Sequence, residues 1–500
     1  MGEGWDPLVD DLRARRDRVS AMGGTEHLER QRAGRRLDAR ARVDALLDPG
    51  TFVELGALVG SVHRGVIEPV PADGLVAGHG LVDGRPVLVG AEDFSVLGGT
   101  IGLGTAEKRR RLVDLSEQER DPLVLLLESA GERGQNQFER RARTPGDLQA
   151  LARLSGSVPL VGAVMGAVAG HSALTAPLLD FVVMVEGAAL FASGPPAVLE
   201  ATGQEVDREE LGGTAIHTTV SAVVHNAAPD DRAALVLLRH YLSYLPTNAW
   251  EHPPATPAGP DADPRRLDAL AGVLPADARQ PYDVHAVLDL VVDTGSVLEV
   301  QPAFGRAVVT ALARLGGEAV AIVANQPAIA GGAIDADAAD KAAHFLEVAD
   351  AFHLPVVFLA DTAGIPAGTA ADRDGILRHA ARMFAAQAAI SSPKLHVTLR
   401  RAYGFGGALM ALQPFDAQTV ALALPGARLG PVPGGGDPGD SAALLEHGEL
   451  GGAYAAADTM RYDEVVEPAE LRDALLAALR LTAARRRSQP QPVVRRGIRP

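Results

Sequence analysis

The chain has 500 residues, a formal net charge of −16 and no cysteine, with 47% hydrophobic and 22% charged residues. This length and composition predict two or three globular domains with full cores, while the acidity argues against nucleic acid or an anionic membrane surface as the main partner. The lack of cysteine excludes a disulfide framework, a thiolate zinc site and a cysteine nucleophile, and it fits a cytoplasmic protein.

The chain begins with "MGEGWDPLVDDLRARRDRVS", which carries too many charges for a secretory signal peptide. Arg-rich stretches lie at 13–18, 30–36 and 484–500. We interpret these stretches as solvated faces or tails, and the alternative is that one of them contacts the phosphates of a ligand.

The most apolar stretch is "PLVGAVMGAVAGHSALTAPLLDFVVMV", residues 159–185. Its glycines, together with His171, Pro177 and Asp180, interrupt what would otherwise be a candidate membrane helix. The pattern therefore predicts a strand, a turn, a helix and a second strand, and no membrane partner.

The chain repeats itself. "DGRPVLVGAEDFSVLGGTIGLGTAEK" and "GGEAVAIVANQPAIAGGAIDADAADK" carry glycine and lysine at the same places, and such self-similarity indicates a duplicated structural unit. The matches that share one constant offset are Gly84 with Gly317, Gly98 with Gly331, Gly99 with Gly332, Lys108 with Lys341, and Ala130-Gly131 with Ala363-Gly364. Three further residues of offset predict matches of Gly170 with Gly406, Asp180 with Asp416, and Gly194-Pro195 with Gly430-Pro431.

Each repeat alternates apolar β-branched runs with Ala-rich helical stretches, a pattern typical of βαβ layering. The sequence therefore predicts an α/β protein of two tandem domains. We place the N-terminal domain at 1–251, a Pro-rich linker at 252–281 and the C-terminal domain at 282–500, because 252–281 is rich in Pro, Ala and Asp.

Two turns in each repeat can bring backbone amides to one point. An apolar strand ends in a carboxylate-containing turn with Ala-Gly, at Ala130-Gly131 and at Ala363-Gly364, and about forty residues later a second strand ends in a glycine turn that opens a helix. Amides aimed at an oxygen in a dry site stabilise its developing charge by about 2.7–4 kcal/mol per donor. The alternative is that these glycines only allow tight packing. The duplication of both turns favours a ligand.

Other catalytic motifs are absent from the sequence. It contains no G-x-x-x-x-G-K-[ST] phosphate loop, no G-x-S-x-G and no H-E-x-x-H. The 14 histidines are scattered singly, so the sequence predicts no metal site.

The chain resembles the carboxyltransferase (β) subunits of biotin-dependent acyl-CoA carboxylases of the propionyl-CoA and acetyl-CoA carboxylase type, in the crotonase-like superfamily. The likeness runs nearly end to end, through "RRLDARARVDALLDPGTFVEL", "DGLVAGHGLVDGRPVLVGAEDFSVLGGTIG", "TGQEVDREELGGTAIHTTVSAVVH" and "YLSYLP". It continues through "PYDVHAVLDLVVDTGSVLEVQP", "IVANQPAIAGGAID", "DTAGIPAGTAADRDGILRHAARM" and "RRAYGFGGALM". The resemblance implies two tandem crotonase-like (ClpP/crotonase) domains.

The resemblance also implies one oxyanion hole in each domain. The N-terminal hole would hold the thioester oxygen of the acyl-CoA at Gly170 and His171. The C-terminal hole would hold the biotin ureido oxygen at Phe405 and Gly406. The reaction so implied moves a carboxyl group from carboxybiotin to the α carbon of a short- or medium-chain acyl-CoA through a thioester enolate, without a side-chain base.

Further substrate contacts and partners follow from the same resemblance. Ala408, five positions after Tyr403, corresponds to a residue that lines the acyl pocket and helps to choose chain length, and an alanine there predicts a preference for propionyl or a longer acyl group. The expected partners are the acyl-CoA, a separate biotin carboxylase and biotin carrier subunit, and other copies of the chain in a homo-oligomer, which we expect to be a hexamer. The substrate-binding residues are predicted to be Ala130, Gly131, Ala363, Gly364, Tyr403 and Ala408.

Three departures from the family's motifs leave alternatives open. "SAGER" at 129–133 stands for "SGGAR", and His171 in "VAGHSALTAP" stands where the second glycine usually lies. Past Pro425 the usual helical segment is replaced by "GPVPGGGDPGDSAALLEHGELGGAYAAAD". The alternatives are a biotin-dependent acyl-CoA decarboxylase or transcarboxylase, which would use the same two holes, and a non-catalytic CoA-binding scaffold, which the retention of both glycine turns disfavours.

Overall fold

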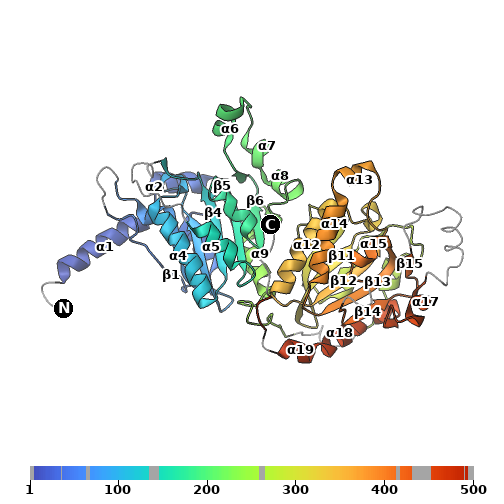
Figure 1. Cartoon of the computed structure of the whole chain (residues 1–500). Coiled ribbons are helices and arrows are strands. Elements are labelled where there is room, and N and C mark those ends of the chain that lie inside the picture. Colours follow the sequence, from blue (N-terminus) through green and yellow to red (C-terminus); the bar gives the residue numbers. More distant parts are fainter. Residues whose placement is uncertain are drawn as a thin grey trace. The chain divides into compact units, whose positions relative to one another are not determined.

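The computed structural model describes residues 5–34, 36–62, 68–134, 146–257, 265–412, 417–430, 452–488 and 490–493. The chain forms two compact units that divide between Ser243 and Tyr244 (Figure 1). Residues 431–451, which include most of the segment that departs from the family, lie outside the described residues. No helix in the described part of the chain is long and apolar enough to cross a membrane.

Unit 1 is built on a mixed eight-stranded sheet. Its strand order is β1-β2-β3-β4-β5-β6-β8, and β7 pairs with β5. The strands from β3 onward run parallel, while β2 pairs antiparallel with β1 and β3. The strands are β1 (Val53–Glu54), β2 (Leu75–Val82), β3 (Arg85–Glu92), β4 (Leu123–Ser129), β5 (Leu160–Ala169), β6 (Phe181–Val185), β7 (Ala189–Phe191) and β8 (Asn226–Ala228).

Unit 2 repeats this sheet with the same order and directions. The order is β9-β10-β11-β12-β13-β14-β16, and β15 pairs with β13. The strands are β9 (Leu298–Val300), β10 (Val308–Leu315), β11 (Glu318–Asn325), β12 (Val356–Thr362), β13 (Lys394–Tyr403), β14 (Val420–Ala423), β15 (Arg428–Gly430) and β16 (Glu464–Val465).

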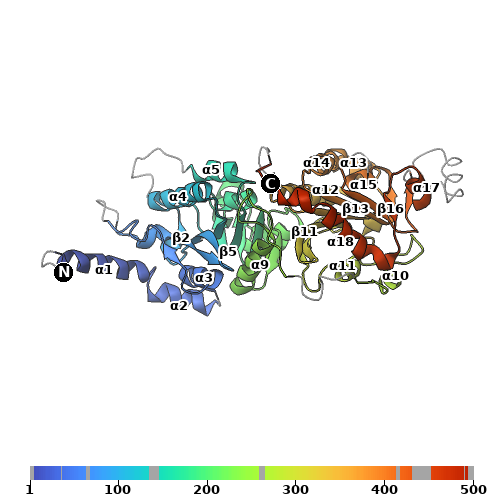
Figure 2. The ribbon, with the colours of Figure 1, turned by 90° about the horizontal axis from the view of Figure 1, so that it is seen from below.

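Helices cover both faces of each sheet, as the βαβ pattern predicted. In Figure 2, α4 and α5 lie on one side of the first sheet with α3 and α9 on the other, and in unit 2 α12 and α14 lie opposite α11 and α18. The helices of unit 1 are α1 (Asp6–Ser20), α2 (Thr25–Ala33), α3 (Ala39–Leu46), α4 (Leu103–Glu119), α5 (Asp147–Leu154), α6 (Pro195–Thr202), α7 (Arg208–Gly212), α8 (Thr214–Thr219) and α9 (Asp231–Tyr244). Those of unit 2 are α10 (Leu270–Val273), α11 (His285–Val291), α12 (Ala336–Ala351), α13 (Thr369–Arg373), α14 (Ile376–Ala388), α15 (Gly404–Leu409), α17 (Ala453–Asp458), α18 (Leu471–Leu481) and α19 (Ala483–Arg487).

The strand register confirms the duplication at the offset that the glycines predicted. Leu88 of β3 pairs with Leu123 of β4, and Ala321 of β11 pairs with Val356 of β12, so both strands are shifted by the distance that separates Gly98 from Gly331. Lys108 and Lys341 also play the same part, because each buried ammonium donates to two backbone carbonyls of its own unit. Burial lowers the pKa of both lysines to about 8.

The larger offset that was predicted beyond the Ala-Gly turns is wrong for the next strand. Leu160 of β5 pairs with Leu123, and Lys394 of β13 pairs with Val356, so the offset grows by a single residue here. Gly404 is therefore the counterpart of Gly170, and Gly406 is not.

The next two predicted matches are wrong for a related reason. The amide of Asp180 donates to Leu160, and the amide of Thr419 donates to Lys394, so Thr419 takes the place of Asp180. β15 is displaced from β7 by the same enlarged offset, which excludes the match of Gly194 with Gly430. The loop before β14 is longer than its counterpart, so an offset counted on glycines alone fails after β13. Asp416 and Pro431 lie outside the described residues.

Within the segment 252–281, which was predicted as a linker, residues 265–281 contribute to the core of unit 2. Leu267, Leu270 and Leu274 are buried against α11, α18 and the strands β10 and β11. The division between compact units precedes this segment because residues 244–251 also contact unit 2. Composition indicated a linker since Pro, Ala and Asp are common there, but burial of Leu270 in α10, and of Leu267 and Leu274 beside that helix, anchors this part of the segment in the core.

Candidate functional site

The two predicted turns of unit 1 lie against each other. The amide of Ala130 donates to the carbonyl of Gly98 at 2.9 Å, and the carbonyl of Gly131 accepts the amide of Ile101 at 2.9 Å. Gly131 has a φ of +97°, which residues with a side chain rarely adopt. A Cβ on Gly170 would lie 3.9 Å from the Gly131 Cα. The structure thus brings the Ala-Gly turn and the Gly170 turn together.

Unit 2 contains the same pair of turns. The carbonyl of Gly364 accepts the amide of Ile334 at 2.9 Å, and Gly364 has a φ of +108°. A Cβ on Gly406 would lie only 2.7 Å from the Gly364 Cα and 3.1 Å from the Thr362 methyl group. Gly406 is therefore required by the close approach of the turn that contains Ala363 and Gly364.

Backbone amides at these turns differ in what they bond. The amide of Gly170 donates to the carbonyl of Phe191 at 3.2 Å, so the fold itself uses it. The amide of His171 meets no acceptor within the described residues. Phe405 and Gly406 lie in the first turn of α15, where a helix supplies no acceptor to its own amides. The available donors are thus His171 in unit 1 and Phe405 and Gly406 in unit 2.

Tyr403 and Ala408 flank the second turn. Tyr403 is the N-cap residue of α15. Ala408 lies inside that helix with its side chain buried, and its carbonyl accepts a hydrogen bond from the Gln387 side-chain amide at 2.9 Å. Their contacts with a substrate stay predictions.

The side chain of His171 belongs to a buried polar network. Its Nε2 lies 2.9 Å from Asp147 Oδ1, and Asp147 Oδ2 accepts the Nε of Arg109 at 2.7 Å. Arg109 also donates to Glu92 at 3.0 Å and to Thr175 at 2.6 Å. Burial raises the pKa of Asp147, but the hydrogen bond from His171 and the charge of Arg109 outweigh it and lower the pKa to about 2. Asp147 is therefore ionised at neutral pH.

The carboxylates before the two Ala-Gly turns are held by arginines. Glu128 accepts hydrogen bonds from Arg42 and Arg36, and Asp361 accepts one from Arg400 and one from Arg401, each at 2.7 Å. Both carboxylates are buried. These ion pairs stabilise the turns, so both carboxylates already have arginine partners within their own unit.

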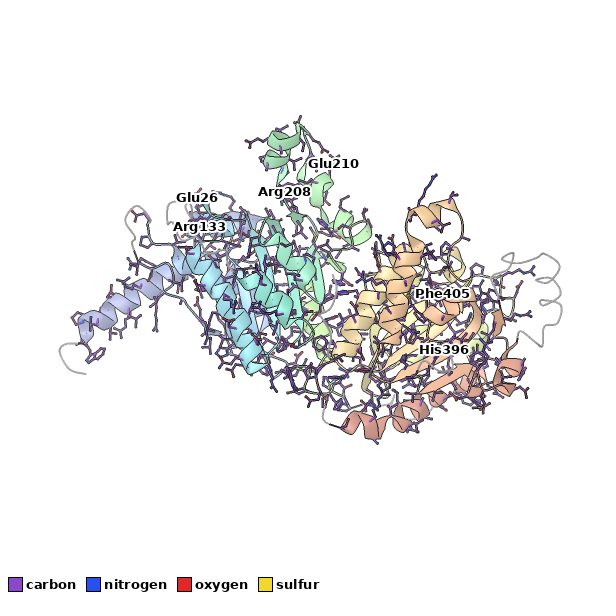
Figure 3. All side chains as sticks on the ribbon, in the orientation of Figure 1. Glu26, Arg133, Arg208, Glu210, His396 and Phe405 are labelled. Carbon is purple, nitrogen blue, oxygen red and sulfur yellow. The ribbon has the colours of Figure 1, made fainter. Side chains whose placement is uncertain are left out.

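A pocket of about 1000 Å³ opens beside the turns of unit 1. Gly98, whose carbonyl bonds Ala130, lines it together with the α2 region and the loop at 94–97. Arg30, Arg36 and Arg208 contribute positive charge to its wall, Glu68 and Glu128 contribute negative charge, and Arg36 pairs with Glu128 at 3.2 Å. Figure 3 shows Arg208 on the segment of α6 to α8 that extends from the sheet. Arg208 forms no ion pair within the described residues, whereas Arg30 pairs with Glu26 at 2.8 Å.

A family model described as the carboxyl transferase domain matches residues 30–437. The chain belongs to the carboxyl transferase domain family. The carboxyltransferase subunit of propionyl-CoA carboxylase from Haloferax mediterranei is 36% identical over 96% of this chain and 97% of its own length. The methylmalonyl-CoA carboxyltransferase 12S subunit of Propionibacterium freudenreichii subsp. shermanii and the methylmalonyl-CoA decarboxylase subunit alpha of Veillonella parvula are each 33% identical over 96% of this chain, and over 95% and 97% of their own lengths.

A solved structure of transcarboxylase 12S matches this carboxyltransferase with a TM-score of 0.89 at 32% identity, and the match covers 97% of this chain and 96% of that one. That structure is described as a hexamer assembly with hydrolysed methylmalonyl-coenzyme A bound. The prediction of two tandem crotonase-like α/β domains is confirmed.

The buried His396 is expected to make the second unit of the carboxyltransferase sensitive to acid. His396 on β13 (Figure 3) lies 2.7 Å from the Met410 carbonyl and 2.7 Å from Thr398 Oγ1. Burial lowers the pKa of its ring to about 4, below the value of about 6.5 in an unfolded chain. In the folded protein the ring is therefore neutral at neutral pH. Its contribution to stability is complete above about pH 6.5 and is lost as the pH falls towards 4.

We expect protonation of His396 to lower the unfolding free energy of the protein by about 3 kcal/mol as the pH falls from about 7 to 4. Urea unfolding across this range measures the loss. His396→Gln removes the titrating group, so its unfolding free energy should fall less with acid than that of the parent chain. Equal slopes for both proteins would mean that another group is responsible.

Sequence reasoning found the turns but missed what surrounds them. Asp147 and Arg109 are far in sequence from His171, and neither belongs to a recognisable motif. Arg208 lies in the stretch 202–225 that carried the family resemblance, but its position on the pocket wall depends on how α7 folds back. A signal for the pocket did exist in the Arg-rich stretch 30–36, for which contact with ligand phosphates was the alternative interpretation.

Proposed function

We propose that this chain transfers a carboxyl group between carboxybiotin, carried on a separate protein, and the α carbon of a short- or medium-chain acyl-CoA. The observation that supports it most directly is the duplicated pair of turns, which leaves the His171 amide in unit 1 and the Phe405 and Gly406 amides in unit 2 without an acceptor in the described part of the unit. Two such donor sets suit a reaction in which two substrates each develop negative charge on a carbonyl oxygen.

The acyl-CoA would bind in unit 1. Arg30, Arg36 and Arg208 on the pocket wall suit the phosphates of coenzyme A, because guanidinium groups bind phosphate through paired hydrogen bonds. The pocket reaches Gly98 and hence the turn at Ala130-Gly131. The thioester would then lie at the Gly170-His171 turn, where the His171 amide is the available donor.

The carboxyl donor would bind at the turn of unit 2. Carboxybiotin supplies carbon dioxide and a basic nitrogen that takes the α proton of the acyl group. The amides of Phe405 and Gly406 suit its ureido oxygen, because they lie in the first turn of α15, where the helix supplies them with no acceptor. Tyr403 and Ala408 lie on either side of these donors, and Ala363 precedes Gly364. We propose that Ala408 sets the acyl-chain preference through another copy of the chain in the homo-oligomer, where its small side chain would suit propionyl or a longer group.

The residues of this chain stabilise negative charge on the two substrates and hold the substrates in position. The His171 amide stabilises the oxygen of the thioester enolate, and the amides of Phe405 and Gly406 stabilise charge on the ureido oxygen. Glu128 and Asp361 are paired with arginines. A base from the protein is unnecessary for the proton transfer, since the second substrate brings one.

The direction of transfer separates the alternatives. Relatives of similar identity include a carboxylase subunit, a transcarboxylase subunit and a decarboxylase subunit, so the same fold serves all three reactions. A homohexamer and a separate biotin carboxylase and carrier subunit are part of the proposal, and the hexamer assembly named for transcarboxylase 12S supports the first. We place the enzyme in the cytoplasm.

The proposal is tested with the purified full chain, methylmalonyl-CoA and free biotin. We expect release of carbon dioxide and propionyl-CoA that depends on biotin, and a lower kcat/KM with malonyl-CoA. The same chain given ATP, bicarbonate and propionyl-CoA should form no methylmalonyl-CoA, since that needs the separate subunits. Absence of biotin-dependent decarboxylation with both CoA esters would contradict the proposal and favour the scaffold.

A further inference from the structure

The residue after the turn glycine occupies the same place in both units. β5 ends at Ala169 and is followed by Gly170 with a φ of +60°, and β13 ends at Tyr403 and is followed by Gly404 with a φ of +53°. The strand register equates these two glycines, so His171 and Phe405 are counterparts. Each carries a backbone amide that meets no acceptor within the described residues of its unit.

In unit 1 the counterpart side chain is tied to the preceding helix by polar bonds. His171 Nε2 lies 2.9 Å from Oδ1 and 3.1 Å from Oδ2 of Asp147, the first residue of α5. Because Asp147 accepts here, Nε2 carries the hydrogen and donates it. Asp147 cannot turn away, since the buried Arg109 on α4 holds its Oδ2 at 2.7 Å.

Arg109 also fixes the residues that follow His171. It donates to Thr175 at 2.6 Å and to Glu92 at 3.0 Å, and Glu92 accepts the hydroxyl of Ser172 at 2.6 Å. The side chain of His171 and the hydroxyls of the next turn thus share one buried guanidinium. A network in which every member is bonded holds a turn in one conformation.

In unit 2 the counterpart contact is aromatic. The ring centroids of Phe405 and of Phe384 on α14 lie 5.4 Å apart, and the two ring planes are inclined by 38°. α14 precedes β13 as α5 precedes β5. The same helix-to-turn contact therefore occurs twice with unrelated chemistry, although a glycine turn needs no side chain to form. In this chain, each residue that carries an available turn amide is thus also anchored by its side chain to the helix before its strand.

We propose that His171 and Phe405 are positioning residues whose side chains fasten the two amide-bearing turns to α5 and α14. The proposal deepens the proposed function and rests on it for the identity of the bound oxygens. His171 acts through Asp147 and Arg109, so its imidazole aims the backbone donor and does not itself need to touch the thioester. A displacement of such a donor by about 1 Å can cost about a hundredfold in rate.

The activity test uses the full chain in biotin-dependent decarboxylation of methylmalonyl-CoA. His171→Ala keeps the amide but loses the bond to Asp147, so we expect kcat to fall about 10- to 100-fold and the KM for methylmalonyl-CoA to change little. His171→Gln can still donate to Asp147 and should recover most of the lost kcat. Phe405→Ala should lower kcat, and Phe405→Leu should recover it. Wild-type kcat in both alanine variants would overturn the proposal.

Hydrogen exchange gives a test that does not depend on activity. In His171→Ala and in Asp147→Asn, amides of the peptide around 170–178 should exchange faster than in the parent chain, while the peptide around 404–410 is unchanged. Phe405→Ala should show the reverse. If wild-type protein lacks decarboxylation but these shifts occur, the proposed function fails and the positioning contact stands. Unchanged exchange at the altered turn would reject the contact, and thermal unfolding and circular dichroism identify a variant that has lost its fold.

Discussion

Gly406→Ala is expected to lower the kcat of biotin-dependent decarboxylation at least about a hundredfold. The added Cβ would lie 2.7 Å from the Gly364 Cα, 3.0 Å from its carbonyl carbon and 3.1 Å from the Thr362 methyl group. Backbone atoms cannot give way as a flexible side chain can, so the start of α15 must move. That movement displaces the amides of Phe405 and Gly406 together. Steady-state kinetics with methylmalonyl-CoA and free biotin measures the loss.

The control is a glycine in the same unit with open surroundings. Gly426 has nothing within 4 Å of an added Cβ and no unusual φ, so Gly426→Ala should keep wild-type kinetics. Binding of coenzyme A, which we propose for unit 1, should be the same in both variants when followed by calorimetry. Normal turnover by Gly406→Ala would place the chemistry away from this turn.

Glycine spacing predicted the offset between the repeats correctly where the backbone conformation requires glycine. Gly98 and Gly99, with their counterparts Gly331 and Gly332, all have positive φ values, so one backbone conformation requires the same letters in both repeats. The offset between the repeats could be counted from them. The error at Gly406 arose because α15 starts with a run of glycines, and any of them satisfies a match by letter.

The parts of the site that sequence could not give are contacts between distant segments. Asp147, Arg109 and Glu92 belong to α5, α4 and β3. They form one chain of bonds that leads to His171 through Asp147, and they do so only because the sheet and its helices bring these elements together. The substitution of histidine for the family's glycine could be seen in the sequence, but the bond of that histidine to Asp147 could not be predicted from it. A backbone donor survives either residue, whereas the bond to Asp147 exists only with histidine.

The carboxylate of each Ala-Gly turn could be found from the sequence, and in the structure this carboxylate supports the turn through buried hydrogen bonds. Asp361 has no exposed surface, and its two oxygens accept the Nε atoms of Arg400 and Arg401. Its backbone amide donates to Asn325 Oδ1 at 3.1 Å. In unit 1 the side chain of the matching Glu128 bonds Arg42 and its backbone amide donates to Glu92, so the same device supports both turns.

Asp361→Ala is expected to lower the unfolding free energy of the protein by about 3–5 kcal/mol, because removing one partner of a buried ion pair leaves the other charge without compensation. Here Arg400 and Arg401 lose a shared partner, and the turn at Ala363-Gly364 loses its support. Asp361→Asn keeps one acceptor oxygen and should lie between the alanine variant and the wild type. Urea unfolding at neutral pH followed by circular dichroism measures these differences.

An exposed pair of the same chemistry in the same unit provides the control. Asp277 accepts the Nε of Arg279 at 3.2 Å, but the side chains are 53% and 91% exposed, so solvent already screens the two charges. Asp277→Ala should leave the urea midpoint unchanged. A loss in Asp361→Ala no larger than that in Asp277→Ala would show that the arginines find water or other partners when the carboxylate is gone. A large loss confined to Asp361→Ala would show that the buried pairs of Asp361 with Arg400 and Arg401 stabilise the unit that carries the Phe405 and Gly406 amides.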